Sequence, residues 1–125
     1  MTSLCYIIET LRRNIVSQNI VARDVTEDTE LAGCVLRKGA RVTMDMMALH
    51  RNPSVWEDPD AFKPERFAPG GEADQAVKKH GMVWMPFSNG ARMCIGVNFS
   101  LNEQRIFLPM LCKSTIILSS SNANT

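Results

Sequence analysis

The chain has 125 residues and a formal net charge of +1, so it is long enough for one small domain and carries no charge excess that would favour a nucleic-acid or acidic membrane partner. Hydrophobic residues make up 45% of the sequence, an ordinary share for a globular protein. The four cysteines are widely spaced and form no C-x-x-C pair, which argues against a structural zinc site and against a dense disulfide framework.

The N-terminal segment predicts an amphipathic helix from residue 4 to about residue 18. Its apolar residues recur at spacings of three and four, at Leu4, Ile7, Ile8, Leu11 and Ile15. No apolar stretch near the N-terminus is long enough for a signal peptide or a membrane span. We therefore expect the chain as given to be soluble and intracellular.

A change of pattern after residue 20 predicts a small β-sheet with at least one hairpin. Short β-prone pieces cover residues 21–25, 31–36 and 41–46, and turn-forming residues separate them. Residues 52 to about 81 then carry prolines at positions 53, 59, 64 and 69 and glycines at 70 and 71. Because proline lacks an N–H and disfavours a helical residue before it, this stretch predicts a coil-rich meander without a long helix or strand.

The C-terminal part predicts a loop over residues 86–96 and then a helix over about residues 97–111. Pro109 is expected to kink or shorten the end of this helix. The polar, small residues that follow predict a disordered tail. The expected organisation is therefore one α+β domain over residues 1–112, followed by the tail at residues 113–125.

The loop that contains Cys94 carries the chemical signal, and it runs from Phe87 to Gly96 as FSNGARMCIG. A cysteine at the start of a helix faces free backbone N–H groups and the positive end of the helix dipole. Both favour a thiolate, which is a soft ligand suited to iron. Gly90 allows a sharp turn, and Gly96 leaves no side chain between the helix and a flat cofactor. Arg92 offers a planar fork to a carboxylate, and Phe87 supplies an apolar wall near the sulfur.

This loop matches every fixed position of the signature F-x-x-G-x-R-x-C-x-G, so the chain resembles the cytochrome P450 family over residues 4 to about 112. The resemblance implies that Cys94 ligates the iron of haem b and that Arg92 contacts a haem propionate. It implies oxygen-dependent monooxygenation of a small apolar substrate, with electrons from a P450 reductase or a ferredoxin at the proximal face. The implied fold is the C-terminal part of the mainly helical P450 fold.

Two further motifs stand in the order that the family has them. Glu9 and Arg12 form an E-x-x-R pair on one helix face, although this spacing alone usually gives only an exposed ion pair. A P-E-R-F segment from Pro64 to Phe67 lies between this pair and the cysteine loop. By resemblance, Glu9, Arg12 and Arg66 form a buried structural triad that locks the loop presenting the cysteine.

Other candidate residues carry weaker signals. Arg23 lies near the place where the family has an arginine for the second propionate, and a solvated strand arginine is an equally good interpretation. We expect His50 to be a hydrogen-bonded structural residue, because the iron already has Cys94 as its ligand. The remaining cysteines, Cys5, Cys34 and Cys112, are expected to be buried structural thiols.

Some features differ from the family pattern. No long helix with an acid–alcohol pair for proton delivery comes before the first motif, Met1 stands just before the E-x-x-R helix, and Arg13 occupies a usually apolar position. We therefore expect a piece of a P450, and the resemblance implies that a full-length parent, if eukaryotic, is anchored in the endoplasmic-reticulum membrane. A variant of the same fold that uses peroxide, or rearranges a hydroperoxide, without a reductase stays open, and two other hypotheses remain. One is a non-catalytic haem-binding or inert fragment, and the other is a small redox or interaction module that uses Cys94 as a free reactive thiol.

Overall fold

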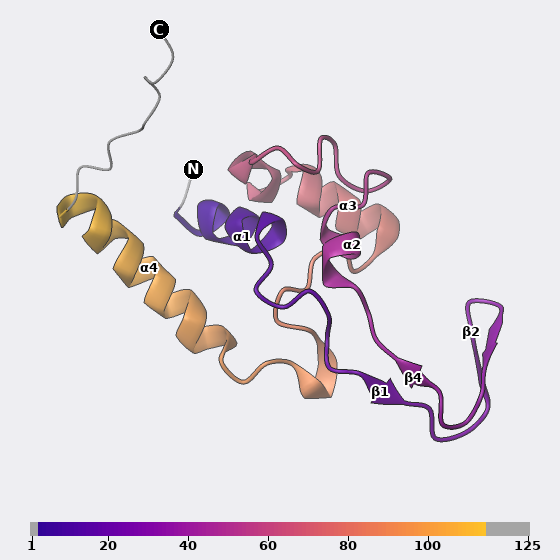
Figure 1. Ribbon diagram of the computed structural model, residues 1–125. Helices are drawn as coiled ribbons and strands as arrows, with labels where there is room; N and C mark the ends of the chain where they lie inside the picture. Colours follow the sequence, from indigo (N-terminus) through magenta and orange to yellow (C-terminus); the bar gives the residue numbers. More distant parts are fainter. Residues whose placement is uncertain (1–2, 115–125) are drawn as a thin grey trace, which may run out of the picture. The chain divides into compact units, whose positions relative to one another are not determined.

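The computed structural model describes residues 3–114, and the side chains as far as Leu111. The chain divides into two compact units, one ending at Met93 and the other starting at Cys94, and each is described by itself. The elements in chain order (Figure 1) are α1 (Ser3–Arg13), β1 (Arg23–Asp24), β2 (Thr29–Leu31), β3 (Cys34–Leu36), β4 (Arg41–Val42), α2 (Met46–His50), the 3-10 helix η1 (Pro64–Phe67), α3 (Glu72–His80), the 3-10 helix η2 (Gly90–Arg92) and α4 (Val97–Ser114). None of the helices within residues 3–114 combines the length and the apolar character that crossing a membrane requires.

Helix α1 turns one face inward, against α2 and η1. The buried residues of this face are Cys5, Ile7, Glu9, Leu11 and Arg12. The helix ends at Arg13, earlier than the predicted residue 18, because the chain leaves the helix to pair with a later segment. Ile20 N–H donates to the Met44 carbonyl at 3.2 Å, and Met46 N–H donates to the Gln18 carbonyl at 2.7 Å. Asn14 N–H still donates to the Thr10 carbonyl at 2.7 Å, and the long-range bonds then take the place of a further helical turn.

The β region consists of two separate two-stranded antiparallel ladders (Figure 1) instead of one small sheet. Strand β1 pairs with β4, and β2 pairs with β3 in a hairpin. A hairpin was predicted, but its turn at Ala32 and Gly33 falls inside the predicted strand over residues 31–36, and both turn residues have positive φ, 49° and 80°. The predicted strand over residues 41–46 ends at Val42, because Asp45 caps α2 by accepting the Ala48 N–H at 3.0 Å.

The meander prediction holds for residues 52–71 and is wrong for residues 72–80. Between residues 52 and 71 the structure has only the 3-10 helix η1, and then α3 occupies Glu72–His80. This stretch has no proline, acidic residues in its first turn, basic residues in its last turn and Gly81 directly after it, with φ 76°. These are ordinary helix signals. The prolines before residue 70 restrict only their own backbone and that of the residue before each of them, so they do not prevent a helix from starting after Gly71.

The core of the first unit forms where α3 meets the meander. Its buried members are Trp56, Ala73, Ala76 and Val83, and the partly buried Val55, Phe67 and Trp84 pack against them. The ring centroid of Phe67 lies 5.9 Å from that of Trp56 and 5.8 Å from that of Trp84. Aromatic rings at such separations bury a large apolar area in a fixed geometry. The cluster therefore fixes η1 and the segment after α3 in one place.

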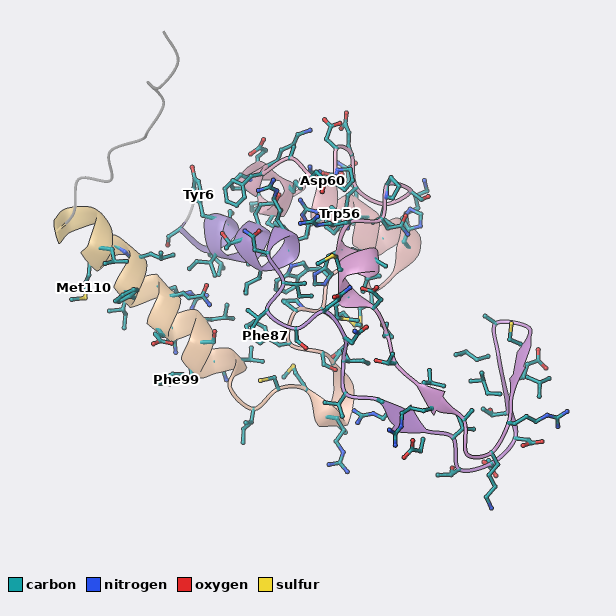
Figure 2. All side chains as sticks on the ribbon, in the orientation of Figure 1. Tyr6, Trp56, Asp60, Phe87, Phe99 and Met110 are labelled. Carbon is teal, nitrogen blue, oxygen red and sulfur yellow. The ribbon has the colours of Figure 1, made fainter. Side chains whose placement is uncertain are left out.

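The described part of the second unit consists of residues 94–96 and α4, which passes through Pro109 to Ser114. Of the predicted kink or shortening at Pro109, the shortening is wrong, because a proline removes only one helical bond and the residues after it can still donate to carbonyls, and the kink stays a prediction. Several large apolar side chains of α4 are exposed, namely Phe99, Ile106, Phe107, Leu108, Met110 and Leu111. Figure 2 shows Phe99 and Met110 projecting from this helix. Residues 115–125 of the predicted tail lie outside the described residues.

Candidate functional site

The E-x-x-R pair forms a fully buried ion pair on the inner face of α1. Arg12 donates from Nε to Glu9 Oε2 at 2.8 Å and from Nη2 to Glu9 Oε1 at 2.8 Å, and neither side chain is exposed. Two parallel N–H···O bonds are the strongest arrangement that this pair can adopt. The backbone N–H of Lys63 donates to the same Glu9 Oε1 at 3.0 Å. Glu9 thus binds the meander directly as well as its helix neighbour.

Arg66 joins this pair from η1. Its Nε lies 3.5 Å from Glu9 Oε1, its Nη2 donates to the Asp58 carbonyl at 2.8 Å, and its side chain is 1% exposed. The structure therefore brings Glu9, Arg12 and Arg66 together and shields them from water, which is the predicted geometry. Arg12 has further buried contacts, because it lies 5.4 Å from the ring centroid of Trp56, an arrangement that a cation and an aromatic face favour.

Glu72 is a fourth member of the cluster, which the sequence analysis missed. Its Oε2 forms an ion pair with Arg66 Nη1, and its Oε1 accepts the Glu57 N–H. Two carboxylates then face two guanidiniums, so the cluster is neutral in total, and a neutral set is less costly to bury than one with an unpaired charge. Gly71 makes the approach possible, because a Cβ there would lie 2.6 Å from the Arg66 carbonyl oxygen. The sequence signal was the pair of acids that opens the proline-free stretch after Gly71.

His50 is buried and hydrogen-bonded, as predicted. Its Nε2 accepts the Met85 N–H at 2.9 Å, and its carbonyl accepts a bond from Arg12 Nη1 at 2.8 Å. Burial, together with the positive charge of Arg12, lowers the pKa of His50 from 6.5 to about 4, and burial is the larger cause. The imidazole is therefore neutral at pH 7, which matches its role as an acceptor at Nε2.

The first part of the cysteine loop belongs to the first unit. Phe87 is half-buried, and Ser88 and Gly90 have positive φ of 63° and 72°, so the predicted sharp turn at Gly90 is present. Asn89 Oδ1 accepts the Gly90 N–H at 2.7 Å, and η2 follows. The side chain of Arg92, at the end of η2, is exposed and has no hydrogen-bond or ion-pair partner among the described residues.

The second unit begins with the cysteine itself. Cys94 is a free, exposed thiol, and Ile95 beside it is fully exposed. The carbonyl of Cys94 accepts the N–H of Val97, the first residue of α4, at 3.4 Å, so the cysteine lies just before the helix as predicted. A Cβ at Gly96 would lie 3.7 Å from Cys94 Sγ, so a larger side chain at that position would begin to cover the sulfur.

The structure agrees with the predictions for some of the other residues and contradicts one of them. Arg23 is exposed on β1 and has no ion-pair partner among the described residues. Cys5 is buried as predicted, but Cys34 is exposed, and the prediction of a buried thiol is wrong there. Its short hairpin is open to solvent on both faces, so no position on it is enclosed. The side chain of Cys112 lies outside the described residues.

Comparison with known proteins identifies relatives of this arrangement. The family model described as "Cytochrome P450" matches residues 5–114. The protein "Probable cytochrome P450 4p3" of Drosophila melanogaster is 33% identical over 126 residues, which cover 100% of this chain and 24% of that relative. "Cytochrome P450 4V2" of Homo sapiens is 38% identical over 109 residues, which cover 87% of this chain and 20% of that relative.

Solved structures contain the same fold. The structure described as "Retinoic acid bound cyanobacterial CYP120A1" matches with a TM-score of 0.79 at 28% identity, over 87% of this chain and 25% of that one. The structure of a zebra fish cytochrome P450 with abiraterone matches with a TM-score of 0.71 at 29% identity, over 86% of this chain and 24% of that one. The chain spans about a quarter of these relatives or less. The α+β piece of the P450 fold predicted from the sequence is thus confirmed, and the chain belongs to the cytochrome P450 family.

Proposed function

We propose that this chain supplies the cysteine-bearing part of a haem-thiolate monooxygenase. Cys94 is the iron ligand in this proposal, and Arg92 pairs with one haem propionate. Phe87 and Gly96 adjoin the cofactor, and Arg23 meets the second propionate. The observation that carries the proposal is the complete signature around the cysteine in a chain of this family.

The described residues suit haem b as the cofactor. The Cys94 thiol is exposed, so an external metal can reach it, and thiolate sulfur is a soft ligand for iron. The neighbouring Ile95 and the later Phe99 are 103% and 73% exposed, and a flat apolar macrocycle would remove such side chains from water. The Arg92 guanidinium has no partner among the described residues, which leaves its donors available to a carboxylate.

When bound, the haem supplies the oxygen chemistry that places one oxygen atom into a small apolar substrate. The chain's own residues hold and tune the cofactor. Cys94 would bind the iron and donate electron density to it, Phe87 would supply an apolar side chain of the cysteine loop, and Arg92 would hold the propionate edge. Electrons from a reductase or ferredoxin at the proximal face, and an endoplasmic-reticulum location, are proposed for a full-length parent.

A hybrid protein tests the proposal. The aligned 109-residue stretch of human cytochrome P450 4V2 is replaced by that of this chain, and the reduced, carbon-monoxide-bound protein is examined by absorption spectroscopy. We expect the red-shifted Soret band of a thiolate-ligated haem. Cys94→Ser should abolish the band, because a serine hydroxyl is neither soft nor readily ionised. Cys34→Ser is the matched control, since Cys34 is also an exposed thiol, and it should keep the band. A band that survives Cys94→Ser would refute the assignment.

A second candidate function is haem binding without turnover by the 125-residue chain itself. The exposed apolar side chains of α4 favour it, because the described residues alone leave them uncovered. A haem titration of the chain should show weak binding that depends on Cys94 and no NADPH-dependent hydroxylation. Tight, stoichiometric haem uptake with turnover would show that the chain needs no further part of the fold. Alkylation of Cys94 without any haem binding would favour the reactive-thiol hypothesis.

A further inference from the structure

His50 lies between the buried charge cluster and the segment that leads into the cysteine loop. Its carbonyl accepts a bond from Arg12 Nη1 at 2.8 Å, and its ring Nε2 accepts the Met85 N–H at 2.9 Å. The ring also stacks on Trp84, with centroids 6.5 Å apart and planes at 17°. The residue is 0% exposed. One side chain and its own carbonyl thus connect α1 to the backbone two residues before Phe87.

Met85 is also hydrogen-bonded to the cysteine loop. Its carbonyl accepts the Ser88 N–H at 3.1 Å, which closes the turn over residues 85–88, and Ser88 has a φ of 63°. Met85 is itself 8% exposed. The entry to the loop is therefore held from one side by the imidazole of His50 and from the other by the turn.

No regular element fixes the position of this segment. Residues 81–89 lie between α3 and η2 and belong to no helix or strand. A buried backbone N–H in such a segment needs an acceptor from elsewhere, because water cannot supply one. The side chain of His50 is that acceptor for Met85.

We propose that His50 is a positioning residue for the cysteine loop, which it holds by accepting the Met85 N–H. The link to haem ligation rests on the proposed function, since it assumes that the loop presents the iron ligand. The anchoring of Met85 does not depend on that assumption, and it can be measured without haem.

Amide hydrogen exchange, followed by NMR on the 125-residue chain, tests the anchoring. His50→Leu keeps an apolar volume but removes the acceptor, whereas His50→Gln keeps a neutral acceptor at the reach of Nε2. We expect His50→Leu to speed exchange at Met85 and Ser88 at least about tenfold, because a protected amide loses its bond. The amides of Leu11 and Ala76 should change little, and His50→Gln should restore slow exchange. His80→Leu, at the exposed end of α3, is the matched control.

Two results overturn the proposal. One is unchanged exchange at Met85 in His50→Leu. The other is equal acceleration at Met85, Leu11 and Ala76, which would mean that His50 only stabilises the fold as a whole. If His50→Leu does not fold, His50→Asn replaces it, because its shorter amide does not reach the Met85 N–H, and the same comparison with His50→Gln applies.

The hybrid protein then tests the link to haem ligation. His50→Leu or His50→Asn should lower the fraction of protein with the red-shifted Soret band, and His50→Gln should retain it. If the parent hybrid lacks the band, the proposed function fails while the exchange result still decides the role of His50. If the band is present and all three variants retain it in full, His50 does not position the ligand loop.

Discussion

Replacing Glu9 by glutamine removes the central negative charge of the buried cluster and keeps the size of the side chain. Glu9 accepts bonds from Arg12 Nε, Arg12 Nη2 and the Lys63 N–H at 2.8, 2.8 and 3.0 Å, and lies 3.5 Å from Arg66 Nε. Glutamine turns an NH₂ group towards at least one of these donors. Two guanidiniums then share only the carboxylate of Glu72.

The expected loss of unfolding free energy is about 3–5 kcal/mol, the usual cost of removing one partner from a buried ion pair. The value is large because Glu9 is 0% exposed, so water cannot replace the lost charge. A domain is stable by only about 5–15 kcal/mol, and the change would therefore remove a large share of the total.

Urea unfolding followed by tryptophan fluorescence measures this loss. Trp56 is a suitable probe, because it is 1% exposed and lies 5.4 Å from the Arg12 guanidinium. Glu30→Gln is the matched control, since Glu30 lies on the exposed strand β2, and it should change stability by less than about 0.5 kcal/mol. A loss below about 1 kcal/mol for Glu9→Gln, with an unchanged dependence on urea, would refute the reasoning, because an exposed pair would behave in that way.

Four further predictions concern the buried cluster, His50 and Arg92. Glu72→Gln should lower the free energy of unfolding by about 1–2 kcal/mol in urea, less than Glu9→Gln, because the Glu72 side chain is 26% exposed. Glu65→Gln is the control, since Glu65 is exposed on η1, and it should leave the stability unchanged. Equal losses for the two variants would contradict the four-membered cluster. The pKa of His50 is lowered from 6.5 to about 4, so below about pH 6.5 the unfolded chain binds a proton that the folded chain does not, and stability should fall by up to about 3 kcal/mol between pH 6.5 and 4. The stability of His50→Gln should not show this part of the decline with falling pH. Parallel pH profiles for the two proteins would show that His50 does not cause it. In the hybrid, Arg92→Ala should weaken haem retention without shifting the Soret band, and a shifted band would mean that Arg92 influences the ligand itself. In the hybrid protein, Glu9→Ala or Arg12→Ala should also abolish haem incorporation. Normal haem content would show that the buried cluster is not needed to hold the cysteine loop.

Local spacing was enough to predict the parts of the site that are contiguous in sequence. Glu9 and Arg12 are three residues apart, so any helix over them places both on one face. The residues of the cysteine loop follow one another directly, so their identity and order already indicate a cofactor ligand at the start of a helix. The final helix was predicted for the same reason, since helical periodicity acts over short distances, whereas a hairpin was predicted with its turn in the wrong place.

Element ends depended on contacts that spacing does not encode. Helix α1 ends at Arg13 because residues 18 and 20 bond to residues 46 and 44, far along the chain. Cys34 is exposed because no element among residues 3–114 covers its hairpin, although its residue type favours burial. The residue types of α3 were sufficient to predict a helix, but the prolines that precede it led to a prediction of coil.

Only the tertiary structure decided which polar groups share the buried space. Glu72 joins Arg66 because Gly71 lets α3 begin against the backbone of η1, and His50 accepts the Met85 N–H because α2 packs beside a segment that has no ladder of its own. The types of these residues gave no hint of their partners. A buried charge or N–H must find its counterpart in three dimensions, and which one it finds is fixed by how the elements pack.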